Sequence, residues 1–213
     1  MGKSCVILGS HLVNQYEFPF WQQNKIVLGL DEAGRGPIAG ELVVAGVVFP
    51  VGYQNTEIND SKKLNEKKRN KLFEVIKEDA LLYQIVIVPN KDIDKYNIYQ
   101  ATRMAMEAIA EKLNVEQVLT DAMPLRIEDF NVQAIVKGDQ KSISIAAASI
   151  LAKVTRDQMM IAYDKKYPEY GFARHKGYPT KQHLKIINEI GICEIHRLSY
   201  QPVRQVILDL GID

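Results

Sequence analysis

Apolar runs alternate with polar segments along most of the chain, and the first two runs lie close together in sequence. Residues 26–31 form a short apolar run, and residues 42–49 form a Val-rich one that ends at Pro50. Runs of this length, bounded by turn residues, predict buried strands. The turn between them is too short for a helical crossover, so the two strands are expected to pair antiparallel. Residues 53–59 are expected to contribute part of a further strand.

The rest of the chain alternates helical spacing with strand-like runs. Apolar spacing predicts helices over residues 65–80, 98–113 and 144–165, and strand-like runs occupy residues 82–88, 115–120 and 134–136. Thr180 is a candidate N-cap for a further helix that Gly191 ends. Pro202 suits the first turn of a last helix that reaches about Leu210.

This order of elements predicts an α/β fold, with a mixed sheet covered by helices on both faces. A chain of 213 residues can bury one sizeable core. We therefore expect a single domain over residues 26–213, with a C-terminal helical extension from about residue 166. Residues 1–25 show little periodicity and are expected to form an N-terminal arm. The arm would pack through its aromatic side chains, Tyr16, Phe18, Phe20 and Trp21.

Carboxylates occur where three of the predicted strands end. Asp31 and Glu32 follow the first apolar run, and Asp121 and Asp139 follow two later ones. Ligands of open α/β sheets bind beyond the carboxyl ends of the strands, so neighbouring ends would bring these acids together. Clustered acids repel one another without a cation, and all-oxygen ligands suit Mg²⁺ first and Mn²⁺ as a substitute. The alternative is that each acid is a solvated strand-end residue.

Two of the acids carry further expectations. Successive strand residues point to opposite faces, so Glu32 is expected just past the strand, in the turn, if it joins Asp31. Asp157, on the predicted long helix, is a further candidate ligand, and an ion pair with Arg156 or Lys153 is the alternative. Two divalent ions about 4 Å apart in such a cluster would suit hydrolysis of a phosphodiester.

Other function classes fit the sequence poorly. Gly34–Ala39 matches G-x-G-x-x-A, but a strand follows it, and two carboxylates beside a pyrophosphate would repel it. There is no P-loop and no serine or cysteine nucleophile elbow. No apolar run approaches the roughly 18 residues of a membrane span, and no convincing secretory signal is present. Cys5 and Cys193 have no metal or redox spacing, which suggests a reducing cytosol and a cytoplasmic protein.

The charge is nearly balanced overall but uneven along the chain. The formal net charge is +1. Between residues 137 and 204, however, twelve Lys and Arg residues face six Asp and Glu residues. This surplus suggests a face for an anionic polymer, and the alternative is a solvated Lys-rich surface.

Ordered motifs between about residues 26 and 204 resemble the bacterial ribonuclease HII family. The motifs are Asp31-Glu-Ala-Gly-Arg-Gly-Pro, Asn59-Asp-Ser-Lys-Lys, Asp121-Ala, Lys137-Gly-Asp, Ala146-Ala-Ala-Ser-Ile-Leu-Ala-Lys, Arg156-Asp, His175-Lys-Gly-Tyr and His196-Arg ahead of Ser199-Tyr. The resemblance implies a ribonuclease H-like fold and a metal-dependent endonuclease. Its substrates would be RNA–DNA hybrids and single ribonucleotides embedded in duplex DNA, cut to leave 3′-hydroxyl and 5′-phosphate ends.

The resemblance also implies roles for individual residues. Asp31, Glu32, Asp121 and Asp139 would form the acidic site, with Asp157 as a possible extra member. The Gly34-Arg35-Gly36 backbone would contact the ribose 2′-hydroxyl, since glycine lets a sugar approach closely. Phosphate contacts would come from Arg35, Asn59, Ser61, Lys62, Lys137, Lys176 and Arg197.

Tyr178 resembles the family's tyrosine at the junction between RNA and DNA. Its ring would stack on the deoxyribose that follows the ribonucleotide, and the alternative is an ordinary loop aromatic. Two other functions remain open: a related nuclease such as a junction resolvase, and a hybrid-binding module without catalysis. We expect a monomer, no membrane partner, and no obvious sliding-clamp-binding tail after Leu210.

Overall fold

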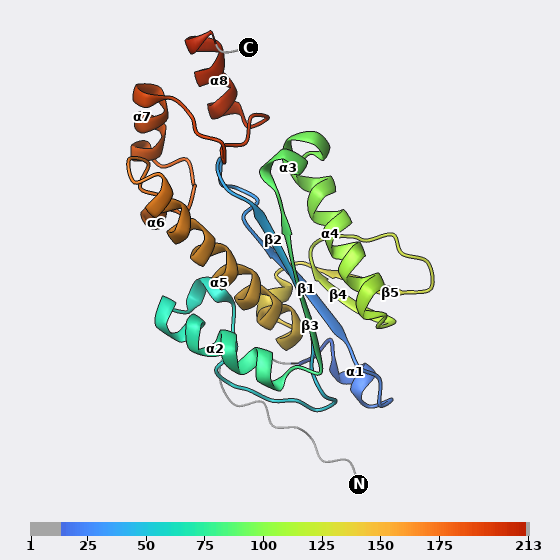
Figure 1. The fold of residues 1–213 in the computed structure, drawn as a ribbon. Coiled ribbons are helices and arrows are strands. Elements are labelled where there is room, and N and C mark those ends of the chain that lie inside the picture. The colour runs from blue at the N-terminus through green and yellow to red at the C-terminus, as the bar shows by residue number, and fades with distance from the viewer. Residues whose placement is uncertain (1–13, 212–213) are drawn as a thin grey trace.

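The computed structural model describes residues 14–211 of the chain, and a five-stranded mixed sheet forms its centre (Figure 1). The strands are β1 (Leu28–Ala33), β2 (Leu42–Val48), β3 (Leu82–Val88), β4 (Gln117–Asp121) and β5 (Asn131–Ile135), in the spatial order β3-β2-β1-β4-β5. Strands β1 and β2 pair antiparallel, as the short turn predicts, and so do β2 and β3. Strands β1, β4 and β5 run parallel, so their carboxyl ends lie at one edge.

Helices cover both faces of the sheet. On one face lie α5 (Ile143–Lys166) and α2 (Glu66–Asp79), and on the other lie α3 (Asn90–Tyr96) and α4 (Ile98–Leu113). The predicted α/β fold with two covered faces is therefore confirmed. No helix among residues 14–211 combines the length and apolarity that crossing a membrane requires.

Helix α5 lies directly on β1. Ser142 caps it by accepting a hydrogen bond from the Ile145 amide, and the Ala-rich first turns are fully buried. A Cβ added to Gly29 of β1 would lie 2.2 Å from the Ser144 carbonyl carbon. Glycine at this point lets the start of α5 touch the strand that carries Asp31.

The N-terminal arm is partly integrated into the core. Residues 18–21 form a short helix, α1 (Phe18–Trp21), and Trp21 is buried with Tyr16 and Phe20 packed beside it. Phe18 is 55% exposed, so its predicted packing role is wrong. Glu17 is fully buried and accepts hydrogen bonds from the Ser142 hydroxyl and the Ser144 amide. The arm residues 1–13 lie outside the described part of the chain.

The C-terminal extension consists of three helices, α6 (Phe172–His175), α7 (Lys181–Ile190) and α8 (Gln201–Leu210), which share their own apolar cluster. This cluster includes Ile38 and Ala39 from the turn after β1. The Ile38 amide donates to the Gly177 carbonyl, and the Gly40 amide donates to the Ile195 carbonyl. The extension therefore holds the Gly-Arg-Gly-Pro turn against the end of the sheet.

Several element predictions need correction. Strand β1 continues to Ala33, because it pairs with β2 over six residues. Residues 53–59 form turns and no strand, and β5 begins at Asn131, three residues before the predicted start. Helices α3 and α6 and the 3₁₀ turns η1 (Ser61–Lys63) and η2 (Gly138–Gln140) are short, so they lack a clear apolar period.

Candidate active site

Three carboxylates meet at the parallel edge of the sheet. Asp31 of β1, Asp121 at the last position of β4 and Asp139 in η2 after β5 each offer an oxygen, and these oxygens lie within 4.8 Å of one another. We call this group the acidic trio. Asp31 and Asp139 are buried, and Asp121 is half-buried. The predicted convergence of strand-end acids is thus seen for these three residues.

Backbone amides hold the acidic trio in place. Asp31 Oδ1 accepts from the Glu32 amide at 2.7 Å, and Asp121 Oδ1 accepts from the Gly138 amide at 2.8 Å. Burial raises the pKa of Asp31 well above its usual range, and the charges of Glu32 and Asp121 raise it further. Burial and the charge of Asp121 also raise the pKa of Asp139. Mutual repulsion of this kind favours a cation between the carboxylates.

Glu32 lies beside the trio rather than past the strand. It is inside β1, so the prediction that it sits in the turn is wrong. Burial raises the pKa of Glu32; Arg35, whose Nη1 is 3.5 Å from Glu32 Oε1, lowers it, and Asp121 raises it. Glu32 Oε2 is buried without a hydrogen-bond partner among residues 14–211. A buried carboxylate oxygen without a partner can accept a ligand, which fits a role beside the trio.

The Asn59–Lys63 loop supplies both a cation and a further acid. Lys62 Nζ lies 3.6 Å from Asp139 Oδ2. Asp60 is buried next to Asp139, and it accepts from the Lys62 amide at 2.9 Å and from Gln140 Nε2 at 3.2 Å. Sequence reasoning missed Asp60, although it stands within the Asn59–Lys63 motif. The missed signal is that an Asp before a 3₁₀ turn caps that turn and so fixes its neighbours.

The Gly-Arg-Gly turn and Tyr178 form a second part of the site. A Cβ added to Gly36 would lie 3.3 Å from Cε1 of the Tyr178 ring, so the two residues are neighbours. Arg35 is exposed, and the Tyr178 side chain is 45% exposed. The Arg35 carbonyl accepts from the Tyr200 hydroxyl at 2.7 Å, which fixes the following peptide unit. The amide of Gly36 therefore points the opposite way, since a trans peptide directs its N–H away from its C=O.

Arg197 does not lie where a phosphate could reach it. Its side chain is fully buried, and Nε donates to the Gly40 carbonyl at 2.8 Å. Arg156 is also buried, and it donates to the carbonyls of Ala39, Glu41 and Lys176. The prediction of an Arg197 phosphate contact is wrong in this structure, because the guanidinium hydrogen-bonds to the turn that precedes β2. Both arginines therefore stabilise this turn by donating hydrogen bonds to its backbone carbonyls.

The other residues predicted to contact phosphates differ in how exposed they are. Asn59 is half-buried, Lys62 and Lys137 are exposed, and Lys176 is half-buried with its ammonium donating to the Ala173 carbonyl. Ser61 is buried, and its amide donates to the Ser149 hydroxyl. Lys62 pairs with Asp139 of the trio, Lys137 precedes Asp139 by two residues, Lys176 precedes Tyr178 by two, and the Ser61 amide in η1 contacts α5.

Asp157 is an ion-pair residue. Its carboxylate oxygens lie 2.7 Å from Lys153 Nζ and 3.8 Å from Arg69 Nη2. The alternative of an ion pair with Lys153 is therefore the one that the structure shows, and Asp157 is not among the residues that converge on the trio. Arg156, the other proposed partner, hydrogen-bonds to backbone carbonyls instead.

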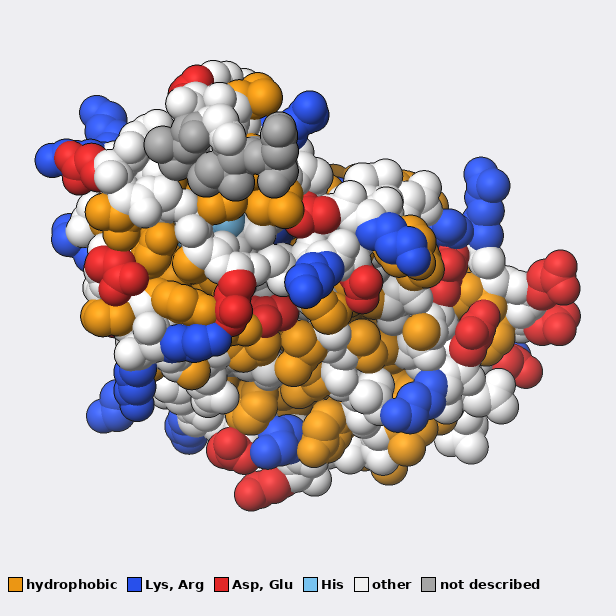
Figure 2. All heavy atoms as spheres, turned by 45° about the horizontal axis from the view of Figure 1, so that its top comes forward, with side chains coloured by type: hydrophobic (Ala, Val, Ile, Leu, Met, Phe, Trp, Pro, Cys, Tyr) orange, Lys and Arg blue, Asp and Glu red, His pale blue; other side chains and the backbone are white. Residues whose placement is uncertain are grey.

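The surface carries charge of both signs. On the face drawn in Figure 2, Lys and Arg side chains are interspersed with Asp and Glu side chains and do not form one continuous basic patch. Two of the twelve basic residues of the 137–204 segment, Arg156 and Arg197, are buried. Two of its six acids, Asp139 and Asp157, are buried as well, so the surplus of basic residues outside the core of this segment remains six.

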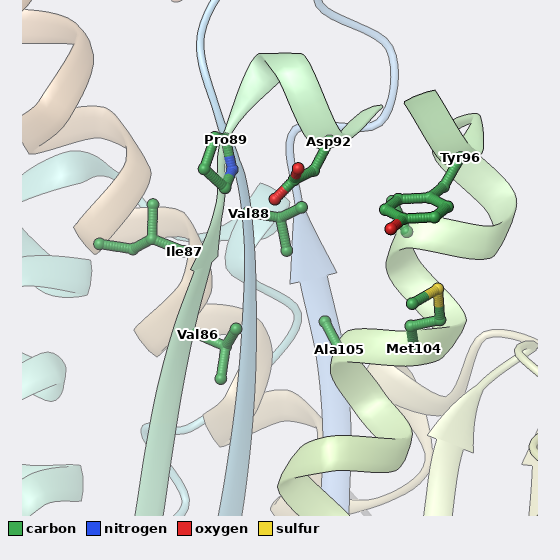
Figure 3. Close-up of a pocket in the computed structure, with 9 residues that line it drawn as sticks. Val86, Ile87, Val88, Pro89, Asp92, Tyr96, Met104 and Ala105 are labelled. Carbon is green, nitrogen blue, oxygen red and sulfur yellow. The ribbon is translucent and has the colours of Figure 1, made fainter. Parts of the chain in front are cut away.

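An apolar groove lies away from the acidic trio. It is lined by β3, α3 and α4, including Ile87, Tyr96 and Met104 (Figure 3). No residue of the trio borders it. The three carboxylates thus lie outside this groove.

Comparison with known proteins places this fold in the ribonuclease H class. The chain superimposes on the ribonuclease H2 of Pyrococcus horikoshii OT3 with a TM-score of 0.72 and 27% sequence identity, over 88% of this chain and 100% of that one. Within that class the chain belongs to the ribonuclease HII family, whose sequence model matches residues 28–203.

Relatives with that description cover most of the chain. The ribonuclease HII of Listeria monocytogenes serotype 4b (strain F2365) is 50% identical over 91% of this chain and 75% of its own length. That of Francisella tularensis subsp. tularensis (strain WY96-3418) is 50% identical over 86% of this chain and 99% of its own. The protein is accordingly a ribonuclease H, an endonuclease for RNA–DNA hybrids.

Proposed function

We propose that the protein incises duplex DNA on the 5′ side of a single embedded ribonucleotide, in addition to cutting the RNA strand of hybrids. The observation that carries this proposal is that Tyr178 lies next to Gly36, in the turn whose Arg35 pairs with Glu32. A residue that contacts a 2′-hydroxyl and one that stacks on the next sugar must lie together for a single ribonucleotide to suffice.

We further propose that the site works with divalent metal, with Mg²⁺ or Mn²⁺ as the ion. The donor set supports this: three carboxylates converge, burial and mutual repulsion raise the pKa of Asp31 and Asp139, and Glu32 adds an oxygen without a partner. Asp31, Asp121 and Asp139 would hold the metal, with Glu32 beside them. A divalent ion at such a site activates water and stabilises the departing oxygen.

The chain's own residues then bind and orient the substrate. Arg35, Lys62, Lys137 and Lys176 supply positive charge for the phosphates around the scissile bond. The Gly36 amide would face the ribose directly 3′ to that bond, and the Tyr178 ring would face the deoxyribose that follows it. No covalent enzyme intermediate is part of the proposal, and the products carry 3′-hydroxyl and 5′-phosphate ends.

The test is cleavage of three matched duplexes: one DNA duplex with a single ribonucleotide, one full hybrid and one all-DNA control. Wild-type protein in Mg²⁺ should cut the first only 5′ to the ribonucleotide and leave the all-DNA control intact. Asp121→Asn should lose at least about a hundredfold in rate, since a trio carboxylate is removed. Cutting of all-DNA junctions would instead favour a resolvase, and binding without cleavage would favour a silent hybrid-binding module.

A further inference from the structure

A chain of hydrogen bonds through two buried histidines ends on the backbone of Tyr178. His183 Nδ1 lies 2.9 Å from the Tyr178 carbonyl oxygen, and His183 Nε2 lies 3.1 Å from His196 Nε2. At the other end, the Cys193 amide donates to His196 Nδ1 at 3.0 Å. Both side chains are buried, with His183 at 0% and His196 at 1% exposure.

The backbone groups at the two ends of this hydrogen-bond series determine which ring nitrogens of the two histidines carry protons. A backbone carbonyl only accepts, so His183 carries its proton on Nδ1 and accepts at Nε2. His196 must then donate from Nε2, and its Nδ1 accepts from the Cys193 amide, which only donates. With both rings neutral, every nitrogen of the pair has a partner. His196 Nδ1 also lies 3.2 Å from the Cys193 carbonyl oxygen, which would accept from Nδ1 if that ring were protonated.

The surroundings keep the pair neutral. The His175 ring stacks on His183 with centroids 4.2 Å apart, and the Tyr170 and Phe172 rings pack against the same cluster. His175 Nε2 bonds to the Tyr170 carbonyl, and Cys193 Sγ lies 3.3 Å from His196 Nδ1. No carboxylate is among these contacts, and burial lowers the pKa of His183 and of His196 to about 4.

Both backbone groups of Tyr178 are fixed by this cluster. The Tyr178 amide donates to the His175 carbonyl at 2.9 Å, and its carbonyl accepts from His183 at 2.9 Å and from the Thr180 amide at 2.8 Å. The side chain itself is 45% exposed and contacts Gly36. A half-exposed ring has few side-chain contacts to hold it, so its position depends on the peptide units from which it extends.

We propose that His183 and His196 are positioning residues that set the Tyr178 ring against Gly36 and thereby determine selectivity for an embedded ribonucleotide. This inference rests on the proposed role of Tyr178 in recognising the sugar. Neither histidine touches the acidic trio or the substrate. They act through the Tyr178 carbonyl.

Two amide substitutions test the hydrogen bonds of the two His183 ring nitrogens one at a time. In His183→Asn the side-chain NH₂ occupies the place of Nδ1 and can still donate to the Tyr178 carbonyl. In His183→Gln the amide reaches the place of Nε2, so the bond to His196 is kept and the one to Tyr178 is lost. Both variants are polar and of similar volume. Tyr170→Phe, which removes a hydroxyl bonded to the Gly191 carbonyl, is a control within the same cluster.

The experiment measures the rate ratio between the single-ribonucleotide duplex and the full hybrid, together with the NMR signal of the Tyr178 ring in ¹³C-labelled protein. Loss of one neutral hydrogen bond predicts about a tenfold fall in the ratio for His183→Gln, with a shifted ring signal. In His183→Asn and in Tyr170→Phe, the rate ratio should stay within about threefold of wild type. The Tyr178 ring signal should not shift in either variant. If His183→Gln does not fold, His183→Leu, which also removes the bond to the Tyr178 carbonyl, carries the same expectation.

Wild-type behaviour in His183→Gln, or equal losses in the Asn and Gln variants, would overturn the inference. A wild-type protein that does not cut at single ribonucleotides would instead overturn the proposed function. In that case the Tyr178 ring signal still decides whether the histidines position it.

Discussion

Lys62 Nζ lies 3.6 Å from Asp139 Oδ2, and the lysine side chain is 79% exposed while the Asp139 side chain is 4% exposed. A mobile surface cation thus partly neutralises a buried carboxylate of the acidic trio. The charges of Asp139, Asp31, Asp60 and Asp121 raise the pKa of Lys62, although burial opposes them. The ammonium therefore stays charged at neutral pH and competes with a metal for the same acids.

Lys62→Gln should move metal and substrate affinity in opposite directions. Without the ammonium the trio is more negative, so it should bind Mg²⁺ or Mn²⁺ about two- to fivefold more tightly, as expected for an exposed ion pair of about 0.5–1 kcal/mol. The lost positive charge should raise KM for duplex substrates. Metal titration by calorimetry and steady-state kinetics measure the two effects. Lys63→Gln, an exposed neighbour in the same 3₁₀ turn, is the control, and weaker metal binding in Lys62→Gln would contradict the argument.

The two buried histidines predict a loss of stability in acid. Burial lowers the pKa of His183 and His196 to about 4, whereas an unfolded histidine titrates near about 6.5. Between these values the unfolded chain binds more protons, so the free energy of unfolding should fall as pH drops from 6.5 towards 4. Each histidine contributes at most about 1.4 kcal/mol per pH unit.

Urea unfolding at pH 7, 6, 5 and 4 in wild type and His183→Asn measures this contribution. Burial raises the pKa of Asp31, Asp139 and Glu32, so those carboxylates act in the opposite sense and stabilise the fold as they are protonated. Comparing the two proteins cancels that effect. The variant should show a shallower decline, and parallel curves would show that His183 does not titrate between these pH values.

Sequence patterns predicted the sheet well because its strands are apolar throughout. All seven residues of β2 are buried, and the run that forms it ends at a proline. The acids of the trio were also predictable, since three parallel strands end at one edge. The local sequence pattern gave a wrong prediction where a tertiary contact determined the end of a strand. Pairing with β2 extends β1 through Glu32, and this places Glu32 beside the trio rather than in the turn.

The two arginines show a second limit of sequence reasoning. Lys and Arg in a basic segment suggest a surface, yet Arg156 and Arg197 are buried because the turn after β1 has carbonyls that require donors. Nothing in the spacing of the 137–204 segment distinguishes these two from its exposed lysines. The Asn59–Lys63 loop shows the same limit, because Asp60 acts by capping a turn that has no apolar period.

Asp157→Asn should affect stability and leave metal binding unchanged. The Asp157 carboxylate pairs with Lys153 and Arg69, and all three side chains are largely buried. Removing the negative charge leaves two cations with a weaker partner, which should cost about 1–3 kcal/mol of unfolding free energy. Metal affinity by calorimetry should stay within twofold of wild type, in contrast to Asp121→Asn. A tenfold loss of metal affinity in Asp157→Asn would restore Asp157 as a ligand.

The two glycines of the Gly-Arg-Gly turn should respond differently to alanine. Gly34 has φ +108°, and an added Cβ would lie 2.3 Å from Arg156 Nε and 2.9 Å from the Glu41 carbonyl oxygen. Gly34→Ala should therefore cost several kcal/mol of stability, from about 1–3 kcal/mol of backbone strain and about 1–3 kcal/mol of overpacking. Gly52→Ala is the control, because Gly52 has φ +80° and nothing within 4 Å of its added Cβ. It should show the strain alone in urea unfolding.

Gly36→Ala is the sharper test of sugar recognition. The φ of Gly36 is outside the left-handed region, and among residues 14–211 its added Cβ would meet only the Tyr178 ring, at 3.3 Å. A shift of a few tenths of an ångström by a half-exposed ring accommodates this contact, so the stability should change by less than about 1 kcal/mol. The methyl group would nevertheless occupy the surface that faces the sugar. We expect the rate at a single ribonucleotide to fall at least about tenfold relative to wild type, measured on the duplex with one ribonucleotide beside the full hybrid. A folded Gly36→Ala variant with wild-type rates on both duplexes would show that the sugar does not approach the protein at this residue.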